Sequence, residues 1–238
     1  MTEPGHASRE ILPLVEDWSY VPDKATSRWL AGDGDNAGTN VRLPHTWNDR
    51  DTFQTEVAYR QGDGSYRCRF CAPPEEIDRN AATWRLRSEG FYGTGEVWLD
   101  GRRMSAFDAQ YIGLDIDLTP FLQPASESML GIRLTNRCAS HVLPGIDMPD
   151  FILHGGLAGR VWLERIPGLA LEWDETWVTT NLVSGARAEL SMATSVQNRS
   201  AKPRVAAIFC GMEMCGIMMW ALMLFSFAAR ARACAWLP

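Results

Sequence analysis

The sequence predicts an all-β protein, with a jelly-roll β-sandwich over residues 1–167 and an incomplete second β-sandwich over residues 168–204. Three observations support this prediction. Apolar and polar residues alternate along many short segments, which is typical of antiparallel strands with one buried face. Glycine, proline and Asp-Gly turns separate those segments. No segment before residue 200 carries the apolar stripe of an amphipathic helix, so a layered β architecture is favoured.

The predicted strands of the first sandwich follow one another at short intervals. Tyr66, Cys68 and Phe70 alternate with Arg67 and Arg69, and the same period of two recurs in later segments up to residue 164. Because alternate side chains of a strand point to the same face, the pattern predicts which residues face the core. They are Tyr66, Phe70, Trp84, Leu86, Val97, Leu99, Ile116, Leu118, Ile132, Leu134, Val161 and Leu163.

Turn residues lie where these strands should end. Asp100-Gly101 follows the apolar segment Val97–Leu99 and is typical of a tight β-hairpin. Prolines fall between the predicted strands, where a missing backbone N–H disrupts no ladder hydrogen bond. These prolines are Pro73, Pro74, Pro120, Pro124, Pro144 and Pro149.

Residues 168–204 indicate the start of a second sandwich. Trp177–Thr180 and Ala188–Val196 have strand character, and a polar turn follows at residues 197–200. Two strands with an unpaired edge do not form a stable domain alone. We therefore expect this second sandwich to be incomplete, with the chain truncated relative to a larger protein.

The composition changes after Arg204. Residues 205–238 hold three of the six cysteines and five of the ten methionines, and Met214–Ala229 is an uncharged run of 16 residues. Three interpretations are open: a membrane-spanning anchor, a buried helix, or out-of-frame translation. The run is short for a membrane span, which needs about 20 apolar residues. We favour out-of-frame translation, because this segment interrupts a half-built sheet.

Composition excludes several other classes of function. The net charge is −6 and no run of Lys or Arg is present, which argues against a nucleic-acid partner. The six cysteines lack the paired spacing of a zinc site, so we expect no metal and no cofactor. The first 18 residues lack the basic and apolar regions of a signal peptide. A cytoplasmic protein with reduced thiols and no membrane partner is predicted.

Four stretches match motifs that recur together in one family of enzymes. They are Leu43–Asn48 (LPHTWN), Tyr59–Arg67 (YRQGDGSYR), Gly95–Gly101 (GEVWLDG) with Asp115–Leu122 (DIDLTPFL), and Asp150–Leu157 (DFILHGGL) closing on Arg160–Leu163 (RVWL). Each is weak alone, but four in this order over about 120 residues are specific. The chain thus resembles the amino-terminal sugar-binding domain of glycoside hydrolase family 2, of the β-galactosidase type.

Two departures from the family pattern concern local packing. Ser65 stands where the family usually has tryptophan, and the loop before it is one residue longer. Residues 158–160 (AGR) stand where the family commonly has an aromatic residue followed by Arg-Asp. The resemblance still implies a galactose-binding-like jelly roll followed by an immunoglobulin-like sandwich.

The resemblance also implies a role in sugar binding. A loop of the family's jelly roll reaches into the active site of a neighbouring barrel, where an aspartate matching Asp150 hydrogen-bonds the sugar. A carboxylate on a loop at the end of a sandwich is suited to accept bonds from two adjacent hydroxyl groups. The alternative is that Asp150 only forms a turn after Pro149. Arg60, Tyr59 and Glu56 lie on a loop that could face the same site.

The family's chemistry needs two carboxyl groups about 5 Å apart, which its members carry as glutamates on a (β/α)₈ barrel of roughly 250 residues. No such barrel fits in this chain, and we expect Glu75, Glu76, Asp115 and Asp117 to be solvated charges. The sequence therefore predicts no catalytic residue, and an inactive portion of a β-glycosidase whose ligand is a β-glycoside. A free-standing carbohydrate-binding module and a membrane-tethered lectin-like protein are the alternatives.

Overall fold

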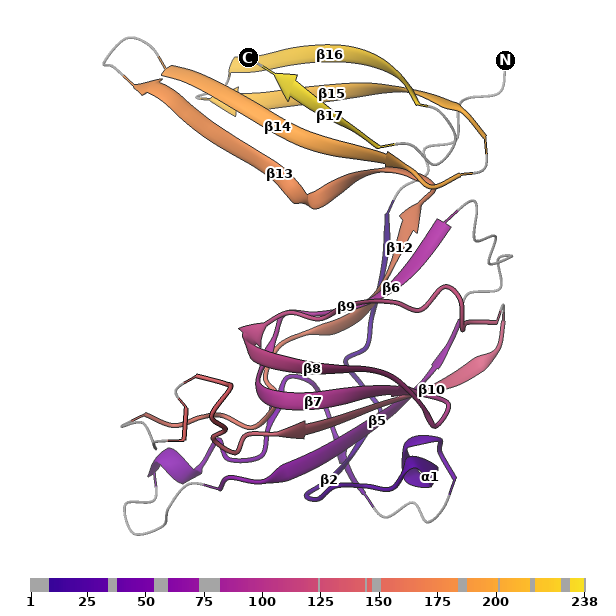
Figure 1. Ribbon diagram of the computed structural model, residues 1–238, viewed down its shortest axis with the longest axis vertical. Helices are drawn as coiled ribbons and strands as arrows, with labels where there is room; N and C mark the ends of the chain where they lie inside the picture. Colours follow the sequence, from indigo (N-terminus) through magenta and orange to yellow (C-terminus); the bar gives the residue numbers. More distant parts are fainter. Residues whose placement is uncertain are drawn as a thin grey trace. The chain divides into compact units, whose positions relative to one another are not determined.

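The structure is a computed structural model of the 238-residue chain. It describes residues 9–33, 38–53, 60–72, 82–123, 125–143, 145–146, 151–183, 188–200, 202–214, 217–227 and 232–237. The chain forms two compact units, one of residues 10–77 and 84–164 and the other of residues 1–9, 78–83 and 165–238. Each unit is built almost entirely of β-strands (Figure 1).

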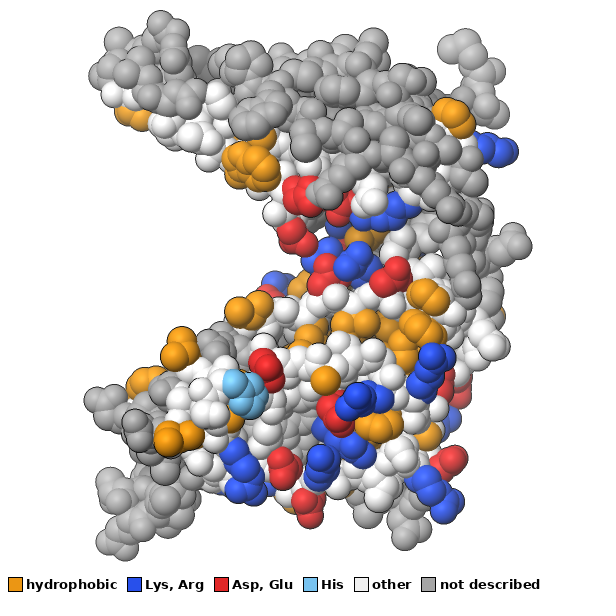
Figure 2. All heavy atoms as spheres, in the orientation of Figure 1, with side chains coloured by type: hydrophobic (Ala, Val, Ile, Leu, Met, Phe, Trp, Pro, Cys, Tyr) orange, Lys and Arg blue, Asp and Glu red, His pale blue; other side chains and the backbone are white. Residues whose placement is uncertain are grey.

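The larger sheet of the first unit has six strands in the order β3-β2-β5-β10-β7-β8 (Figure 1). All neighbours in this sheet are antiparallel. The strands are β2 (Trp18–Val21), β3 (Thr39–Val41), β5 (Asp63–Cys71), β7 (Phe91–Leu99), β8 (Arg102–Ile112) and β10 (Glu127–Thr135). The predicted hairpin is confirmed: Asp100 and Gly101 join β7 to β8 with φ values of 49° and 75°. Figure 2 shows charged side chains of both signs on the visible face of this unit.

A second sheet completes the sandwich, with the strand order β1-β12-β6-β9. Its strands are β1 (Glu10–Pro13), β6 (Ala82–Ser88), β9 (Asp115–Asp117) and β12 (Val161–Pro167). A separate two-stranded ladder joins β4 (His45–Thr46) to β11 (Gly156–Leu157). Short helices occur at α1 (Ser27–Leu30) and η1 (Asp51–Phe53).

The core of this unit lies between the two sheets and confirms the period-two prediction. Eleven of the twelve predicted inward residues are buried, and the twelfth, Ile116, is partly buried and packs against the same cluster. The sequence therefore predicts the buried faces of these strands, because a slip of one residue would expose the whole apolar set.

Strand β5 is covered on both faces, which differs from the simple alternation. Arg67 was expected to face solvent, yet it is only 4% exposed. Its guanidinium lies 4.3 Å from the centre of the Trp29 ring and donates a hydrogen bond of 2.8 Å to the Trp29 carbonyl oxygen. Trp29 belongs to α1, a single turn capped by Thr26. Four residues are too few to produce a helical period in the sequence, so this cover was missed.

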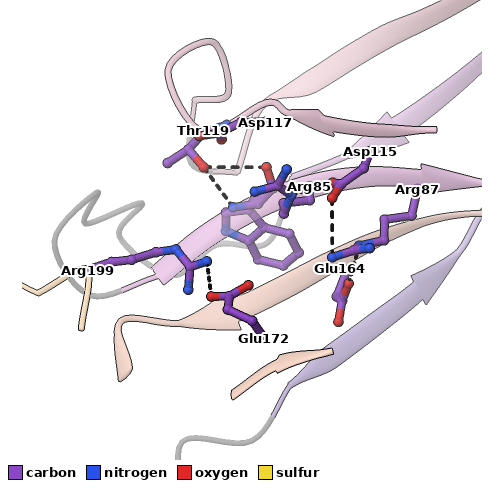
Figure 3. Close-up of polar contacts among 9 residues, drawn as sticks. Arg85, Arg87, Asp115, Asp117, Thr119, Glu164, Glu172 and Arg199 are labelled. Atoms are coloured by element: carbon purple, nitrogen blue, oxygen red, sulfur yellow. Dashed lines mark hydrogen bonds and ion pairs between the residues drawn. The ribbon is translucent and has the colours of Figure 1, made fainter. Parts of the chain in front are cut away.

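Ion pairs follow the polar face of the smaller sheet (Figure 3). Asp115 pairs with Arg85 and lies 3.5 Å from the Arg87 guanidinium, and Glu164 pairs with Arg87 at 2.7 Å. Asp117 accepts a hydrogen bond of 2.9 Å from the backbone N–H of Thr119. Both aspartates are exposed, as expected of solvated charges, and cross-strand arginines neutralise Asp115 in addition. Glu75 and Glu76 lie outside the described residues.

The second unit contains antiparallel strands on both sides of residue 204. β13 (Leu169–Val183), β14 (Ala188–Asn198) and β17 (Arg232–Leu237) form one sheet, and β15 (Arg204–Met214) pairs with β16 (Ile217–Phe227). Strands β13 and β14 contain the two strands that the sequence predicts. Arg199, directly after β14, pairs with Glu172 of β13 (Figure 3).

The described residues between 205 and 238 form strands, so the interpretation of this segment as a buried helix is wrong, and a membrane anchor stays a prediction. An uncharged run has no period of two when both of its faces are apolar, so the sequence pattern could not distinguish strand from helix. Out-of-frame translation stays a prediction. Among the residues that the structure describes, no helix is long and apolar enough to cross a membrane.

Candidate functional site: a loop cluster at one end of the sandwich

The structure brings three of the four sequence motifs together at one end of the first unit. Strand β4, from the LPHTWN motif, pairs with β11, from the DFILHGGL motif, through Gly156↔Thr46 and Leu157↔His45. The backbone N–H of Trp47 also donates to the carbonyl oxygen of Gly155 at 3.0 Å. We call the segments 43–51, 60–62, 136 and 153–157 the loop cluster.

Two fully buried asparagines hold the loop cluster together. Asn48 donates to the Leu153 carbonyl at 3.0 Å, and its own side-chain oxygen accepts from the Gly155 N–H at 3.0 Å. Asn136 donates to the same Leu153 carbonyl at 2.9 Å, and its oxygen accepts from the Gly62 N–H at 2.8 Å. An amide side chain both donates and accepts, so it can replace a missing strand ladder between loops.

Of the predicted sugar-binding residues, only Arg60 lies within the described part of the chain. Asp150, Tyr59 and Glu56 lie outside the described residues. Arg60 donates to the Tyr20 hydroxyl at 2.9 Å and to the carbonyl oxygens of Pro22 and Asp63 at 2.9 and 3.0 Å. Through these hydrogen bonds the Arg60 guanidinium connects the segment of Tyr20 and Pro22 to the start of β5. A direct contact between Arg60 and sugar stays a prediction.

Four aromatic rings fill the space beside Arg60. Tyr20 stacks on Trp47 with ring centres 6.0 Å apart, and Tyr66 lies 4.9 Å from Tyr20 and 6.4 Å from Trp47. His45 completes the cluster at 4.9 Å from Tyr20. The Arg60 guanidinium lies 5.6 Å from the Trp47 ring centre, within the range of a cation–π interaction. The arrangement gives the loops a rigid, apolar support.

Burial fixes the protonation of His45 and Tyr66. Burial lowers the pKa of His45, although the nearby Asp49 carboxylate opposes this change. Burial likewise raises the pKa of Tyr66 well above its usual value, so the phenol keeps its proton. The His45 Nδ1 and the Tyr66 hydroxyl are 2.8 Å apart. A neutral imidazole next to a protonated phenol allows the phenol to donate this bond.

A cleft of about 480 Å³ opens beside these rings, and its volume lies within the range of pockets that hold a small ligand. We call it the motif cleft. Its lining includes Tyr20, Pro44, His45, Thr46, Trp47, Asp49, Arg50 and Arg60. These side chains offer hydroxyl, carboxylate and guanidinium groups next to aromatic surface. Such a set can bind a sugar, whose hydroxyl groups both donate and accept hydrogen bonds.

Two buried polar atoms near this cleft have no hydrogen-bond partner among the described residues. They are the Trp47 Nε1 and the His154 Nδ1. A buried donor or acceptor without a partner costs about 1–3 kcal/mol, so it usually meets water or a ligand. The structure gives His154 a half-buried position next to the Gly155-Gly156 turn.

Sequence reasoning missed Tyr20, Asn48 and Asn136 as residues of this region. Asn48 is the last residue of the LPHTWN motif. Its role in holding Gly155 depends on a contact between residues more than 100 positions apart in the sequence. Asn136 follows directly after strand β10. A buried asparagine at the end of a strand is unusual, because polar side chains are mostly exposed. The sequence gives no sign of its burial.

No protein-family model matches the chain. Individual proteins do match it. The "Putative beta-glucuronidase" of Formosa agariphila is 31% identical over 182 residues, which cover 76% of this chain and 21% of the relative. The β-galactosidase BoGH2A of Bacteroides ovatus is 25% identical over 201 residues, covering 81% of this chain and 22% of the relative. The chain spans about a fifth of the length of these curated relatives.

Solved structures share the fold. A Bacteroides uniformis β-glucuronidase superposes with a TM-score of 0.84 at 20% identity, over 97% of this chain and 27% of that one. A β-glucuronidase from glycoside hydrolase family 2 gives a TM-score of 0.79 at 17% identity, over 99% of this chain and 27% of that one. The chain is therefore a homologue of the β-glucuronidases and β-galactosidases of glycoside hydrolase family 2, with the β-sandwich fold found in those enzymes.

Proposed function

We propose that this chain is the non-catalytic, sugar-contacting portion of a family 2 β-glycosidase, and that it presents the loop cluster to a catalytic barrel. One observation supports the proposal above all: three motifs that are far apart in the sequence meet in the loop cluster. Two buried asparagines hold them in place. Loops fixed on a rigid sandwich are a common support for binding residues.

The proposed ligand is the sugar unit of a β-glycoside. The relatives carry the names β-glucuronidase and β-galactosidase, which supports this substrate class. Asp150 would contribute the direct sugar contact. It lies three residues before Leu153, whose carbonyl oxygen accepts from both asparagines.

A domain graft tests this proposal. Residues 10–167 would replace the corresponding segment of the Formosa agariphila relative, and folding would be checked by circular dichroism. We expect the graft to hydrolyse a nitrophenyl β-glucuronide or β-galactoside, and Asp150→Ala in the graft to lower kcat/KM by roughly 5- to 150-fold, about 1–3 kcal/mol. The 238-residue chain alone should hydrolyse neither substrate.

The matched control is Glu127→Ala in the same graft. Glu127 is an exposed acid at the start of β10, whereas the loop cluster lies beyond the other end of that strand. We expect its kcat/KM to be unchanged. A folded graft in which Asp150→Ala has the kinetics of the Glu127→Ala control would show that Asp150 only forms a turn. Activity of the 238-residue chain alone, abolished by a single acidic substitution, would refute its non-catalytic role.

A further inference from the structure

A second groove lies on the outer face of the six-stranded sheet, away from the motif cleft. Its volume is about 440 Å³, and it shares no lining residue with the motif cleft. The strand registers arrange its centre in two rows across β10, β7 and β8. Thr135, Thr94 and Asp108 form one row, and Arg133, Glu96 and Ala106 form the next. These residues alternate with the buried residues of the core, so they share the outer face.

One wall of this groove is rigid. The Glu96 carboxylate pairs with Arg133 and Arg103, each at 3.1 Å, and accepts a bond of 3.2 Å from the Trp98 indole N–H. The Arg133 guanidinium also lies 4.6 Å from the centre of the Trp98 ring. Side chains that are already ordered lose little conformational entropy when a ligand arrives. This wall therefore presents a preorganised donor and acceptor pair.

Another part of the lining is accessible to a ligand. The Asp108 carboxylate and His141 Nε2 lie 3.6 Å apart, and both side chains are more than half exposed. Lys24 and Asp63 also line the groove. Lys24 and Arg133 carry two positive charges against three negative charges on Asp63, Glu96 and Asp108.

The charge balance and the hydrogen-bonding groups select the ligand class. A lining with more carboxylates than Lys and Arg side chains disfavours anions such as phosphates and uronates. The described residues contain no group of three His, Cys, Asp or Glu side chains that could hold a metal ion. Threonine hydroxyls, carboxylates and cationic groups together match a ligand whose hydroxyls both donate and accept.

We propose that this groove is a second binding site, which takes a neutral saccharide. Its lining residues lie on strands β5, β7, β8 and β10 and the adjoining loops, apart from the motif cleft. It would hold a neutral glycan while the loop cluster serves the reacting sugar. Hydrogen bonds to an open groove are largely exchanged for bonds to water, so the expected Kd lies in the range of about 1–10 mM.

The test is an NMR titration of the ¹⁵N-labelled 238-residue chain with lactose as the neutral probe. We expect saturable shifts of the amides of Thr94, Gly95, Ala106 and Asp108. Methyl β-glucuronide as the acidic probe should bind these amides at least about 5-fold more weakly, because of the charge of the lining. Shifts confined to the loop cluster, equal binding of the two probes, or no shift at about 50 mM lactose would overturn the proposal.

Three variants separate the groove from the rest of the surface. Ala106→Trp fills the groove from an exposed position and should weaken lactose binding at the groove by about 10-fold or more, whereas Asp108→Ala removes one acceptor and should weaken it about 3-fold. Glu127→Ala removes a comparably exposed acid outside the groove and should leave binding unchanged. Lactose affinity that is the same in all three variants would show that the groove is not the site.

Discussion

The asparagine at the end of β10 offers a direct test of how the loop cluster is held. In Asn136→Ala the side chain loses three hydrogen bonds: to the Gly62 N–H at 2.8 Å, to the Leu153 carbonyl at 2.9 Å and to the Arg60 carbonyl at 3.1 Å. Asn48 still donates to both carbonyl oxygens, so they keep a partner. The Gly62 N–H is the group that loses its side-chain acceptor.

The magnitude follows from these contacts. Three hydrogen bonds at about 0.5–1.5 kcal/mol each, and one buried N–H left without its acceptor, give a destabilisation of about 2–4 kcal/mol. Urea unfolding with a slope of about 1–3 kcal/mol/M would then shift its midpoint down by about 1–2 M. The measurement is urea unfolding of the first unit, followed by the amide signals of its core strands.

Two further variants distinguish the hydrogen bonds from a simple loss of volume. Asn40→Ala makes the same change at an exposed position and should alter the unfolding free energy by less than about 0.5 kcal/mol. Asn136→Asp keeps the acceptor for Gly62 but points a carboxylate at two carbonyl oxygens. It should be at least as destabilising as alanine at pH 7 and should recover below about pH 4, when the carboxyl is protonated. The reasoning is refuted if Asn136→Ala is as stable as Asn40→Ala.

Three other predictions concern the sandwich itself. Glu164→Gln should lower the unfolding free energy by about 1–3 kcal/mol, because it removes the charge of the carboxylate that pairs at 2.7 Å with the partly buried Arg87 guanidinium; urea unfolding with the wild type as reference measures this. Burial alone would raise the pKa of Glu96, but hydrogen bonds from neighbouring arginine and tryptophan side chains lower it overall. Its stabilising contribution is therefore complete above pH 4.5 and is lost as the pH falls through the lowered pKa, so thermal unfolding of Glu96→Gln should depend less on pH in that acidic range. Burial raises the pKa of the Cys68 thiol to about 12, whereas Cys71 is exposed. At pH 8 iodoacetamide should label Cys71 in the native chain and Cys68 only after unfolding, as peptide mass spectrometry would show; equal labelling of the two thiols would contradict the burial of Cys68.

The sequence predicted most of the sandwich because strands with one buried face alternate apolar and polar residues. Strand β5 shows how far this reasoning extends: Tyr66 and Phe70 were correctly placed in the core from alternation alone. On the other face, the same alternation placed Arg67 in solvent, whereas it lies beneath the Trp29 ring. The pattern records only the character of each side chain. It does not show which distant segment packs against that side chain.

The loop cluster was predictable only in part. The motifs that build it were identified from their order along the chain, and they suggested Asp150 and Arg60 as sugar contacts. The network that joins the motifs could not be predicted, because it depends on the approach of residues such as Asn48 and Leu153 from distant parts of the sequence. Hydrogen bonds between loops have no period and no composition of their own. They become visible only in three dimensions.

The hydrogen bonds that anchor the loop cluster determine where its sequence can vary at little cost in stability. The segment between Asp51 and Arg60 begins and ends at one fixed point, because the Arg60 N–H donates to the Asp51 carboxylate at 2.6 Å. The segment before Leu153 ends at another fixed point, where both asparagines hold the backbone. Lengthening a loop whose ends are anchored costs little, since the closure entropy grows only with the logarithm of its length. Insertions, deletions and new side chains between these anchors can therefore accumulate while the sandwich beneath them stays unchanged.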